Sequence, residues 1–116
     1  MRPHLLHVEL HRDARGNLIS LEPGTSTPFS LQRVFFIFDV PPAASRGGHT
    51  TTCQELVIAL QGSCAATVVH NGAEQVFQLM SPTQALYVPA GVALTLRCFS
   101  PGALLAVAAD GPHMPR

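Results

Sequence analysis

The chain has 116 residues, which is enough for one domain with a single core and too few for two. Apolar residues make up 47% of it and charged residues only 12%, and so low a charged share predicts that a partner subunit covers part of the apolar surface. Seven basic and seven acidic residues cancel to a formal net charge of zero, so the sequence lacks the cationic field that attracts nucleic acid or an anionic membrane.

The sequence also bears on compartment and redox state. No apolar run reaches the roughly 18 residues needed to cross a bilayer, and the first residues do not resemble a signal peptide. We therefore expect a cytoplasmic protein. Cys53, Cys64 and Cys98 are an odd number without Cys-x2-Cys spacing, which argues against a disulfide framework and a structural zinc site and favours reduced, buried thiols.

Short runs rich in β-branched and aromatic residues alternate with Gly and Pro, and no long apolar stripe of helical period occurs. This pattern predicts an all-β domain, a sandwich or barrel of antiparallel strands. In chain order, we expect strands over residues 5–10, 17–22, 32–40, 55–60, 63–70, 74–79, 85–88, 93–99 and 103–109.

Two turn signals stand out between and after these runs. Asn71-Gly72 predicts a type I′ hairpin, because both central residues of that turn need a positive φ. Gly111-Pro112 predicts the end of the domain, with a frayed tail over residues 110–116. No internal repeat or linker divides the chain, so we expect one domain over residues 1–116.

The segment that ends at Gly62 resembles the first motif of the cupin barrels, Gly-x5-His-x-His-x3/4-Glu-x6-Gly. His49 and Glu55 keep its spacing, whereas Thr51 stands in place of the second histidine. Because alternate residues of a strand face the same way, we expect His49, Thr51, Cys53 and Glu55 to share one face, presented to the barrel interior.

The second cupin motif, Gly-x5-Pro-x-Gly-x2-His, survives only in part. Pro89 and Gly91 keep it, but Leu94 stands where the motif has a ligating histidine. A divalent metal wants three or four nitrogen or oxygen ligands that converge at about 2.0–2.2 Å. Only His49 and Glu55 remain, so we expect neither a metal nor another cofactor.

Four segments carry a more specific resemblance. They are Asp13-x-Arg15-Gly16-Asn17-Leu18, Thr27-Pro28-Phe29 with Gln32 to Pro41, Arg46-Gly47-x-His49, and Ser81-Pro82 with Leu86-Tyr87-Val88-Pro89. In this order they resemble the nucleotide-sugar 3,4-ketoisomerases, also described as WxcM-like or FdtA/QdtA-type cupins. The resemblance covers nearly the whole chain, and residues 35–41 are its most specific piece.

The resemblance implies a small cupin barrel, of the RmlC-like jelly-roll type, that forms a homodimer by exchanging N-terminal strands, here residues 1–12. It also implies a metal-free proton transfer that interconverts the 4-keto and 3-keto forms of a dTDP-linked 6-deoxyhexose. Such chemistry needs a base at C3, a proton donor at C4 and groups that stabilise negative charge on the sugar oxygens. Histidine suits both proton steps because its pKa lies near neutrality.

The family frame assigns candidate roles to individual residues of this chain. The implied catalytic residues are His49 as the base, with Glu55 or Thr51 assisting. The implied substrate-binding residues are Arg15, Arg33, Arg46, Phe36 and Tyr87. An arginine suits this task because its guanidinium fork matches a pyrophosphate with two parallel hydrogen bonds.

The departures from the family support a second hypothesis. The family reads Arg-Gly-x-His-Ala-His-Lys where this chain has Thr51 and Thr52, and its Trp-His pair corresponds to Ala93-Leu94. Losing one positioned acid or base typically costs about 10²–10⁴ in rate. The alternative is therefore a degenerate cupin that binds a sugar nucleotide or a partner protein without turnover. A third, weaker hypothesis is a metal-dependent cupin such as a dioxygenase.

Each candidate also has a purely structural explanation. His49 can close a strand end, Glu55 can pair with an arginine, and Arg46 can pair with Asp39 in a loop. Surface or interface positions explain the spaced histidines better than a metal cluster does, namely His4, His7 and His11. Cys53 is not expected to be a nucleophile, because only His49 is close enough in sequence to lower its pKa.

Overall fold

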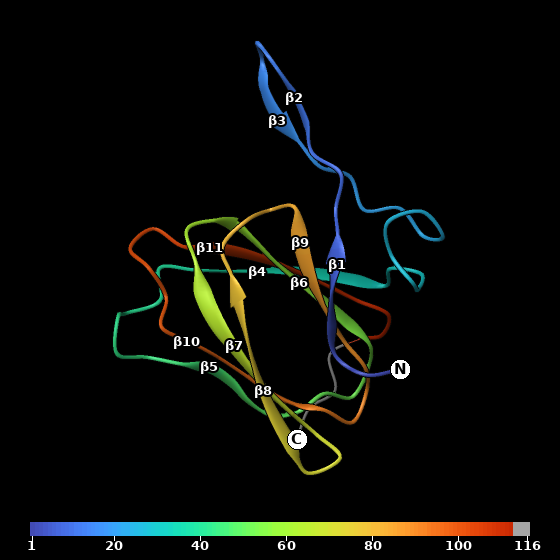
Figure 1. Cartoon of the computed structure of the whole chain (residues 1–116), viewed down its shortest axis with the longest axis vertical. Helices are drawn as coiled ribbons and strands as arrows, with labels where there is room; N and C mark the ends of the chain where they lie inside the picture. The colour runs from blue at the N-terminus through green and yellow to red at the C-terminus, as the bar shows by residue number, and fades with distance from the viewer. Residues whose placement is uncertain (113–116) are drawn as a thin grey trace.

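The computed structural model describes residues 1–112 and has an all-β architecture, as predicted (Figure 1). Its described residues form eleven strands and no helix, so this part of the chain contains no helix that could span a bilayer. The five-stranded sheet contains, in spatial order, β1 (His4–His7), β9 (Gln84–Val88), β6 (Glu55–Gln61), β11 (Leu104–Ala109) and β4 (Arg33–Phe38). The four-stranded sheet contains β5 (Arg46–Thr50), β10 (Ala93–Arg97), β7 (Cys64–His70) and β8 (Ala73–Leu79).

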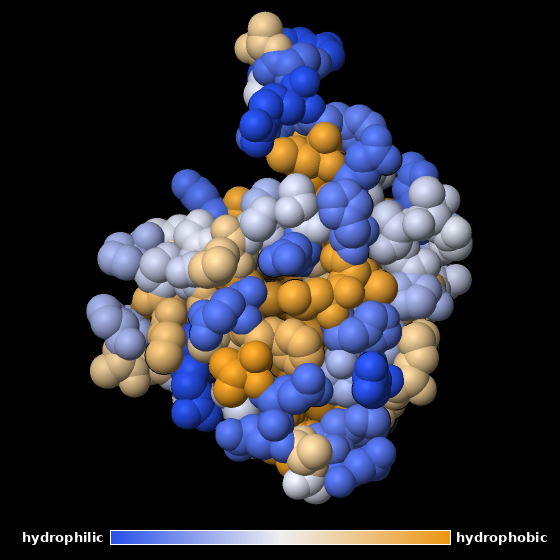
Figure 2. Space-filling model, viewed as in Figure 1, coloured by the Kyte–Doolittle hydropathy of each residue, from blue (hydrophilic) through white to orange (hydrophobic). Residues whose placement is uncertain are grey.

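A small hairpin stands apart from these two sheets. It consists of β2 (His11–Asp13) and β3 (Gly16–Leu18), and it projects from the body of the protein (Figure 1). Figure 2 shows mostly hydrophilic side chains on this hairpin and apolar side chains emerging between polar ones on the body. β1 pairs with β9 of the same chain, and exchange of residues 1–12 between subunits stays a prediction.

The main core lies between the two sheets, and strand alternation decides which residues enter it. On β6, Val57 and Ala59 face this core, whereas Leu56 and Ile58 face a second apolar cluster on the outer side of the sheet. The chain before β4 covers that outer side, with Phe29 and its neighbours packed over it. β6 therefore contributes apolar side chains to both clusters, from its two faces.

The hairpin turn at Asn71-Gly72 is also confirmed. Both residues have positive φ values, 53° and 76°, as a type I′ turn requires. The turn joins β7 to β8 with His70 directly opposite Ala73. This local signal is independent of the rest of the fold, because two residues determine the turn geometry.

Three expectations need correction. His49 to Glu55 is not one strand, because β5 belongs to the four-stranded sheet, β6 belongs to the five-stranded sheet, and residues 51–54 cross between them. Asp110 is not frayed, because it is hydrogen-bonded to Gln54; residues 113–116 of the predicted tail lie outside the described residues. Among the free cysteines Cys98 is exposed, not buried as predicted.

Candidate active site

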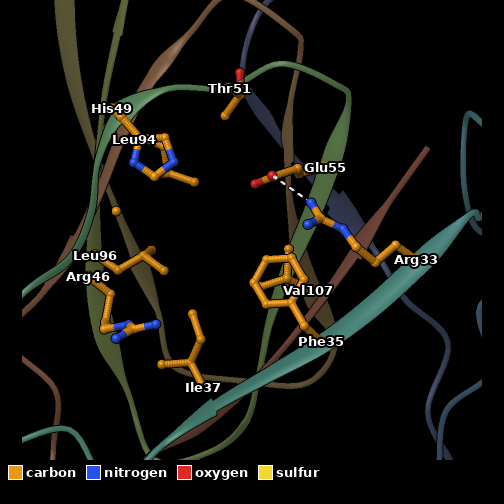
Figure 3. A pocket seen from close by; sticks show the side chains of 11 residues that line it. Arg33, Phe35, Ile37, Arg46, His49, Thr51, Glu55, Leu94, Leu96 and Val107 are labelled. Atoms are coloured by element: carbon orange, nitrogen blue, oxygen red, sulfur yellow. Dashed lines mark ion pairs between the residues drawn. The ribbon is translucent and has the colours of Figure 1, made fainter. Parts of the chain in front are cut away.

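A cavity of about 320 Å³ lies between the two sheets. β4 contributes Arg33, Phe35 and Ile37, and the other lining residues are Arg46, Gly47, His49, Thr51, Glu55, Leu94, Leu96 and Val107. Figure 3 shows His49 and Glu55 projecting into this space from opposite walls. The cavity thus combines an apolar wall with an imidazole, a carboxyl group and two guanidinium groups.

Two glycines bring Arg46 and His49 to the same side of β5. Residues three apart on a regular strand face opposite ways. Here the pairing of β5 with β10 skips Gly48: Leu94 lies opposite His49 and Thr95 lies opposite Gly47. Such a bulge re-aims the side chains that flank it, and both side chains therefore line the cavity.

Gly47 has no room for a side chain. Its φ is +85°, and a Cβ atom there would lie 2.6 Å from the carbonyl oxygen of Leu94. A non-glycine residue would be strained by this φ and would also push β5 away from β10. The motif Arg-Gly-Gly-His is therefore a backbone requirement as well as a source of polar side chains.

Glu55 lies in a largely dry environment beside one cation. Its Oε2 atom is 4.0 Å from Nη2 of Arg33, and its side chain is 13% exposed. Burial raises the pKa of Glu55 above its ordinary value, and the charge of Arg33 only partly offsets this effect. Glu55 therefore keeps a proton to higher pH than an exposed glutamate does.

Arg33 has hydrogen-bonding capacity to spare. Its guanidinium carbon lies 4.9 Å from the centre of the Phe35 ring, and its Nε atom is buried without a hydrogen-bond partner among the described residues. Buried donors are nearly always paired in proteins. Because this Nε atom is buried, an oxygen atom of a ligand in the cavity reaches it only if the Arg33 side chain shifts.

The side chains of His49 and Arg46 also have no partner within residues 1–112. Within residues 1–112, neither side chain makes a hydrogen bond or an ion pair, so the alternative pairing of Arg46 with Asp39 is not formed. A free imidazole can accept a proton from a ligand.

Thr51 lines the cavity, but its polar groups serve the backbone. Its hydroxyl donates to the carbonyl oxygen of Pro89 at 2.9 Å and accepts from the amide of Val92 at 3.2 Å. Its own amide and carbonyl are also bonded, to Val92 and Gly91. Thr51 thus fastens the end of β5 to the turn before β10, which favours a structural role over the assisting role expected from the sequence.

Three of the predicted substrate-binding residues lie elsewhere. Arg15 is on the projecting hairpin, paired with Asp13 at 2.6 Å. Phe36 faces outward and is 57% exposed, because its neighbours Phe35 and Ile37 face the cavity. Tyr87 is buried in the outer apolar cluster and does not line the cavity.

Sequence reasoning missed the apolar wall. Phe35 is the aromatic residue of β4 that lines the cavity, and the period of two starting from Arg33 would have identified it. Leu94 and Leu96 line it from β10. No group of three or more His, Cys, Asp or Glu side chains within residues 1–112 could hold a metal ion, and the absence of a cofactor stays a prediction.

Comparison with known proteins relates this cavity to a family. Residues 1–115 match the family model FdtA, described as WxcM-like, C-terminal. A TDP-4-oxo-6-deoxy-α-D-glucose-3,4-oxoisomerase from Aneurinibacillus thermoaerophilus is 33% identical over 99 residues, which cover 84% of this chain and 71% of that protein.

Solved structures of 3,4-ketoisomerases have the same fold as this chain. A 3,4-ketoisomerase from Helicobacter canadensis is 29% identical, with a TM-score of 0.92 over 98% of this chain and 86% of that one. A double mutant of the 3,4-ketoisomerase QdtA from Thermoanaerobacterium thermosaccharolyticum, in complex with TDP, is 26% identical, with a TM-score of 0.91 over 97% and 83% of the two chains. These matches confirm the predicted cupin barrel, and the chain belongs to the FdtA family, described as WxcM-like, C-terminal.

Proposed function

We propose that the protein is a nucleotide-sugar 3,4-ketoisomerase, which moves the carbonyl group of a dTDP-4-keto-6-deoxyhexose between C4 and C3. Family membership supports the reaction class, as does the activity named for the relatives. The observation that carries the proposal is the convergence of His49, Glu55, Arg33 and Arg46 on one cavity. The cytoplasmic location expected from the sequence belongs to the same proposal.

The proposed reaction uses the two titratable side chains on opposite walls. His49 takes the proton from C3, and the electron pair of that bond forms the C3–C4 double bond of an enediolate. Glu55, protonated through its raised pKa, then delivers a proton to C4 while the hydroxyl proton of O3 passes to O4. The sugar is not oxidised or reduced overall, and the two side chains regain their starting protonation states by exchange with solvent.

The arginines supply charge for both the ground state and the intermediate. Arg33 and Arg46 bring two positive charges, and Glu55 is the one carboxyl group among the lining residues. Such a cavity favours an anion, either the diphosphate of the sugar nucleotide or the enediolate oxygen. Both guanidinium groups line the cavity and can donate hydrogen bonds for this purpose.

The reaction is tested by incubating the protein with dTDP-4-keto-6-deoxyglucose in deuterated water and following C3 and C4 by NMR. With the native protein we expect deuterium at C4 of a 3-keto product and at C3 of the re-formed 4-keto sugar, and neither label with His49→Ala. The matched control is His70→Ala, because His70 does not line the cavity. Exchange that persists in His49→Ala would refute the assigned base.

The bonding of the Thr51 side chain favours a second candidate function, namely binding of a sugar nucleotide without turnover. The family's second histidine is replaced here by a hydroxyl that is committed to Pro89 and Val92, so this position supplies no proton. Tight binding of the same sugar nucleotide without exchange at C3 would identify this function. Stoichiometric iron, zinc or manganese in the purified protein would instead support the metal-dependent hypothesis.

A homodimer that exchanges residues 1–12 is also part of the proposal. β4 is an edge strand, and its outward side chains Val34, Phe36 and Phe38 are at least half exposed. The projecting hairpin of β2 and β3 packs on neither sheet within the described chain. An exposed apolar stripe next to a free sheet edge is a site of association between subunits.

A further inference from the structure

Gln54, the residue before Glu55, is held by four hydrogen bonds. Its amide donates to Oδ1 of Asp110 at 2.8 Å, and its carbonyl accepts from the amide of Asp110 at 3.1 Å. Its side-chain amide donates to Oδ2 of Asp110 at 2.7 Å, and its side-chain oxygen accepts from the hydroxyl of Tyr87. We call Gln54, Asp110 and Tyr87 the clasp.

The clasp joins three strands of the five-stranded sheet at one end. Gln54 leads directly into β6, Asp110 follows directly after β11, and Tyr87 lies on β9. Tyr87 is buried in the outer cluster, so its hydroxyl is held on the side of the sheet away from the cavity. Burial and the charge of Asp110 both raise the pKa of Tyr87, which therefore remains a hydrogen-bond donor at neutral pH.

None of the three clasp residues lines the cavity. Gln54, which the other two bind, directly precedes the cavity residue Glu55. Glu55 is the first residue of β6, and its side chain extends from the backbone position that the clasp holds. The crossover of residues 51–54 has no other strand pairing to keep its last residue in place. Glu55 is itself paired with Ala109 on β11 and with Val88 on β9, and the clasp ties the chain directly before these pairs.

We propose that Asp110, Gln54 and Tyr87 are positioning residues that act through Glu55, holding its carboxyl group in the dry wall of the cavity opposite His49. This inference rests on the proposed function for its catalytic consequence. Shifting a catalytic group by about 1 Å can cost on the order of 100-fold in rate. The clasp therefore contributes to the proton-transfer step and not to substrate affinity.

The first test is a double-mutant cycle. Asp110→Ala is expected to lower kcat by about 10- to 100-fold with little change in KM, because Asp110 does not contact the cavity. In a Glu55→Gln background the same substitution should change kcat by less than about threefold, because residues that act through one another are not additive. Tyr87→Phe, which removes one hydroxyl, should have a smaller effect of the same kind.

A matched control separates positioning from simple stability. Ser100→Ala removes the hydrogen bond that the hydroxyl of Ser100 accepts from the amide of Ser63. Ser63 lies just after the end of β6 that is farther from the clasp. The substitution should cost folding stability without changing kcat. An equal loss of kcat from Asp110→Ala in the native and Glu55→Gln backgrounds would overturn the proposal.

A second measurement needs no substrate and keeps the inference separate from the proposed reaction. The titratable groups that share the cavity with Glu55 are Arg33, Arg46 and His49. In Asp110→Ala, NMR titration of the Glu55 carboxyl carbon should show the pKa of Glu55 moving down toward its ordinary value, because water enters as the clasp opens. In Ser100→Ala the pKa of Glu55 should not change. An unchanged titration in Asp110→Ala would overturn the clasp. A native protein that exchanges no proton at C3 would refute the isomerase and leave this result standing.

Discussion

Arg33 and Glu55 meet across β11, because both lie directly opposite Ala109, one on each neighbouring strand. The small side chain of Ala109 leaves space in which the two charged ends approach to 4.0 Å. The pair joins β4 to β6 on the cavity side of the sheet. It also places a cation beside the carboxyl group to which we assign the proton donor role.

The raised pKa of Glu55 predicts how stability depends on pH. Between the ordinary pKa of a glutamate and the higher pKa in the fold, the folded state binds more protons than the unfolded state, so the free energy of unfolding falls as pH rises through this window. Glu55→Gln removes the titrating group, so the variant should not show this fall in the free energy of unfolding. We expect the variant to gain stability relative to the native protein as pH rises above the ordinary pKa of a glutamate, measured by urea unfolding at a series of pH values. A constant difference across this range would contradict the assignment.

Gly47→Ala should disrupt the junction between β5 and β10. Gly47 and Gly48 both have φ near +85°, but a Cβ atom at Gly47 meets Leu94 whereas one at Gly48 meets nothing within 4 Å. Gly48→Ala therefore measures the backbone strain alone, about 1–3 kcal/mol. We expect Gly47→Ala to be clearly less stable than this control in thermal unfolding and to lose exchange at C3. Equal stability of the two variants would show that the close contact is unimportant.

Thr51→Val tests whether this residue is structural. The substitution keeps the shape of the side chain but leaves the carbonyl of Pro89 and the amide of Val92 without their partner. Leaving buried polar groups unpaired costs about 1–3 kcal/mol each, so denaturant unfolding should show a loss of this order. Thr51→Ser keeps the hydroxyl and should retain most of the stability. If Thr51 assisted the reaction instead, the pH profile of kcat would change in Thr51→Val.

Phe36→Lys tests the homodimer. A charge placed on the exposed face of edge strand β4 should oppose association of two copies through that face. We expect a shift toward monomer in light scattering coupled to gel filtration. The control is Val76→Lys, because Val76 is similarly exposed but lies on β8 of the other sheet. Monomers formed equally by both variants, or by neither, would place the interface elsewhere.

Several features follow from short stretches of sequence. Asn71-Gly72 determines a hairpin by itself, since its two residues tolerate the positive φ of the turn. The alternation along β6 assigns its two faces for the same local reason, which is why Glu55 was correctly expected on the interior face. The family motifs extend over the chain, and they indicated the barrel and the reaction class.

The composition of the cavity depended on contacts between segments far apart in sequence. Alternation alone would turn Arg46 and His49 to opposite sides of β5, and only the bulge against β10 brings both inward. Likewise Phe36 and Tyr87 belong to aromatic motifs, but their strands turn them to the outer face of the sheet. The sequence alone therefore determined the barrel, its main hairpin and the residue types available for proton transfer. Tertiary structure decided which of them meet, because register and bulges arise from pairing between strands that no single segment encodes.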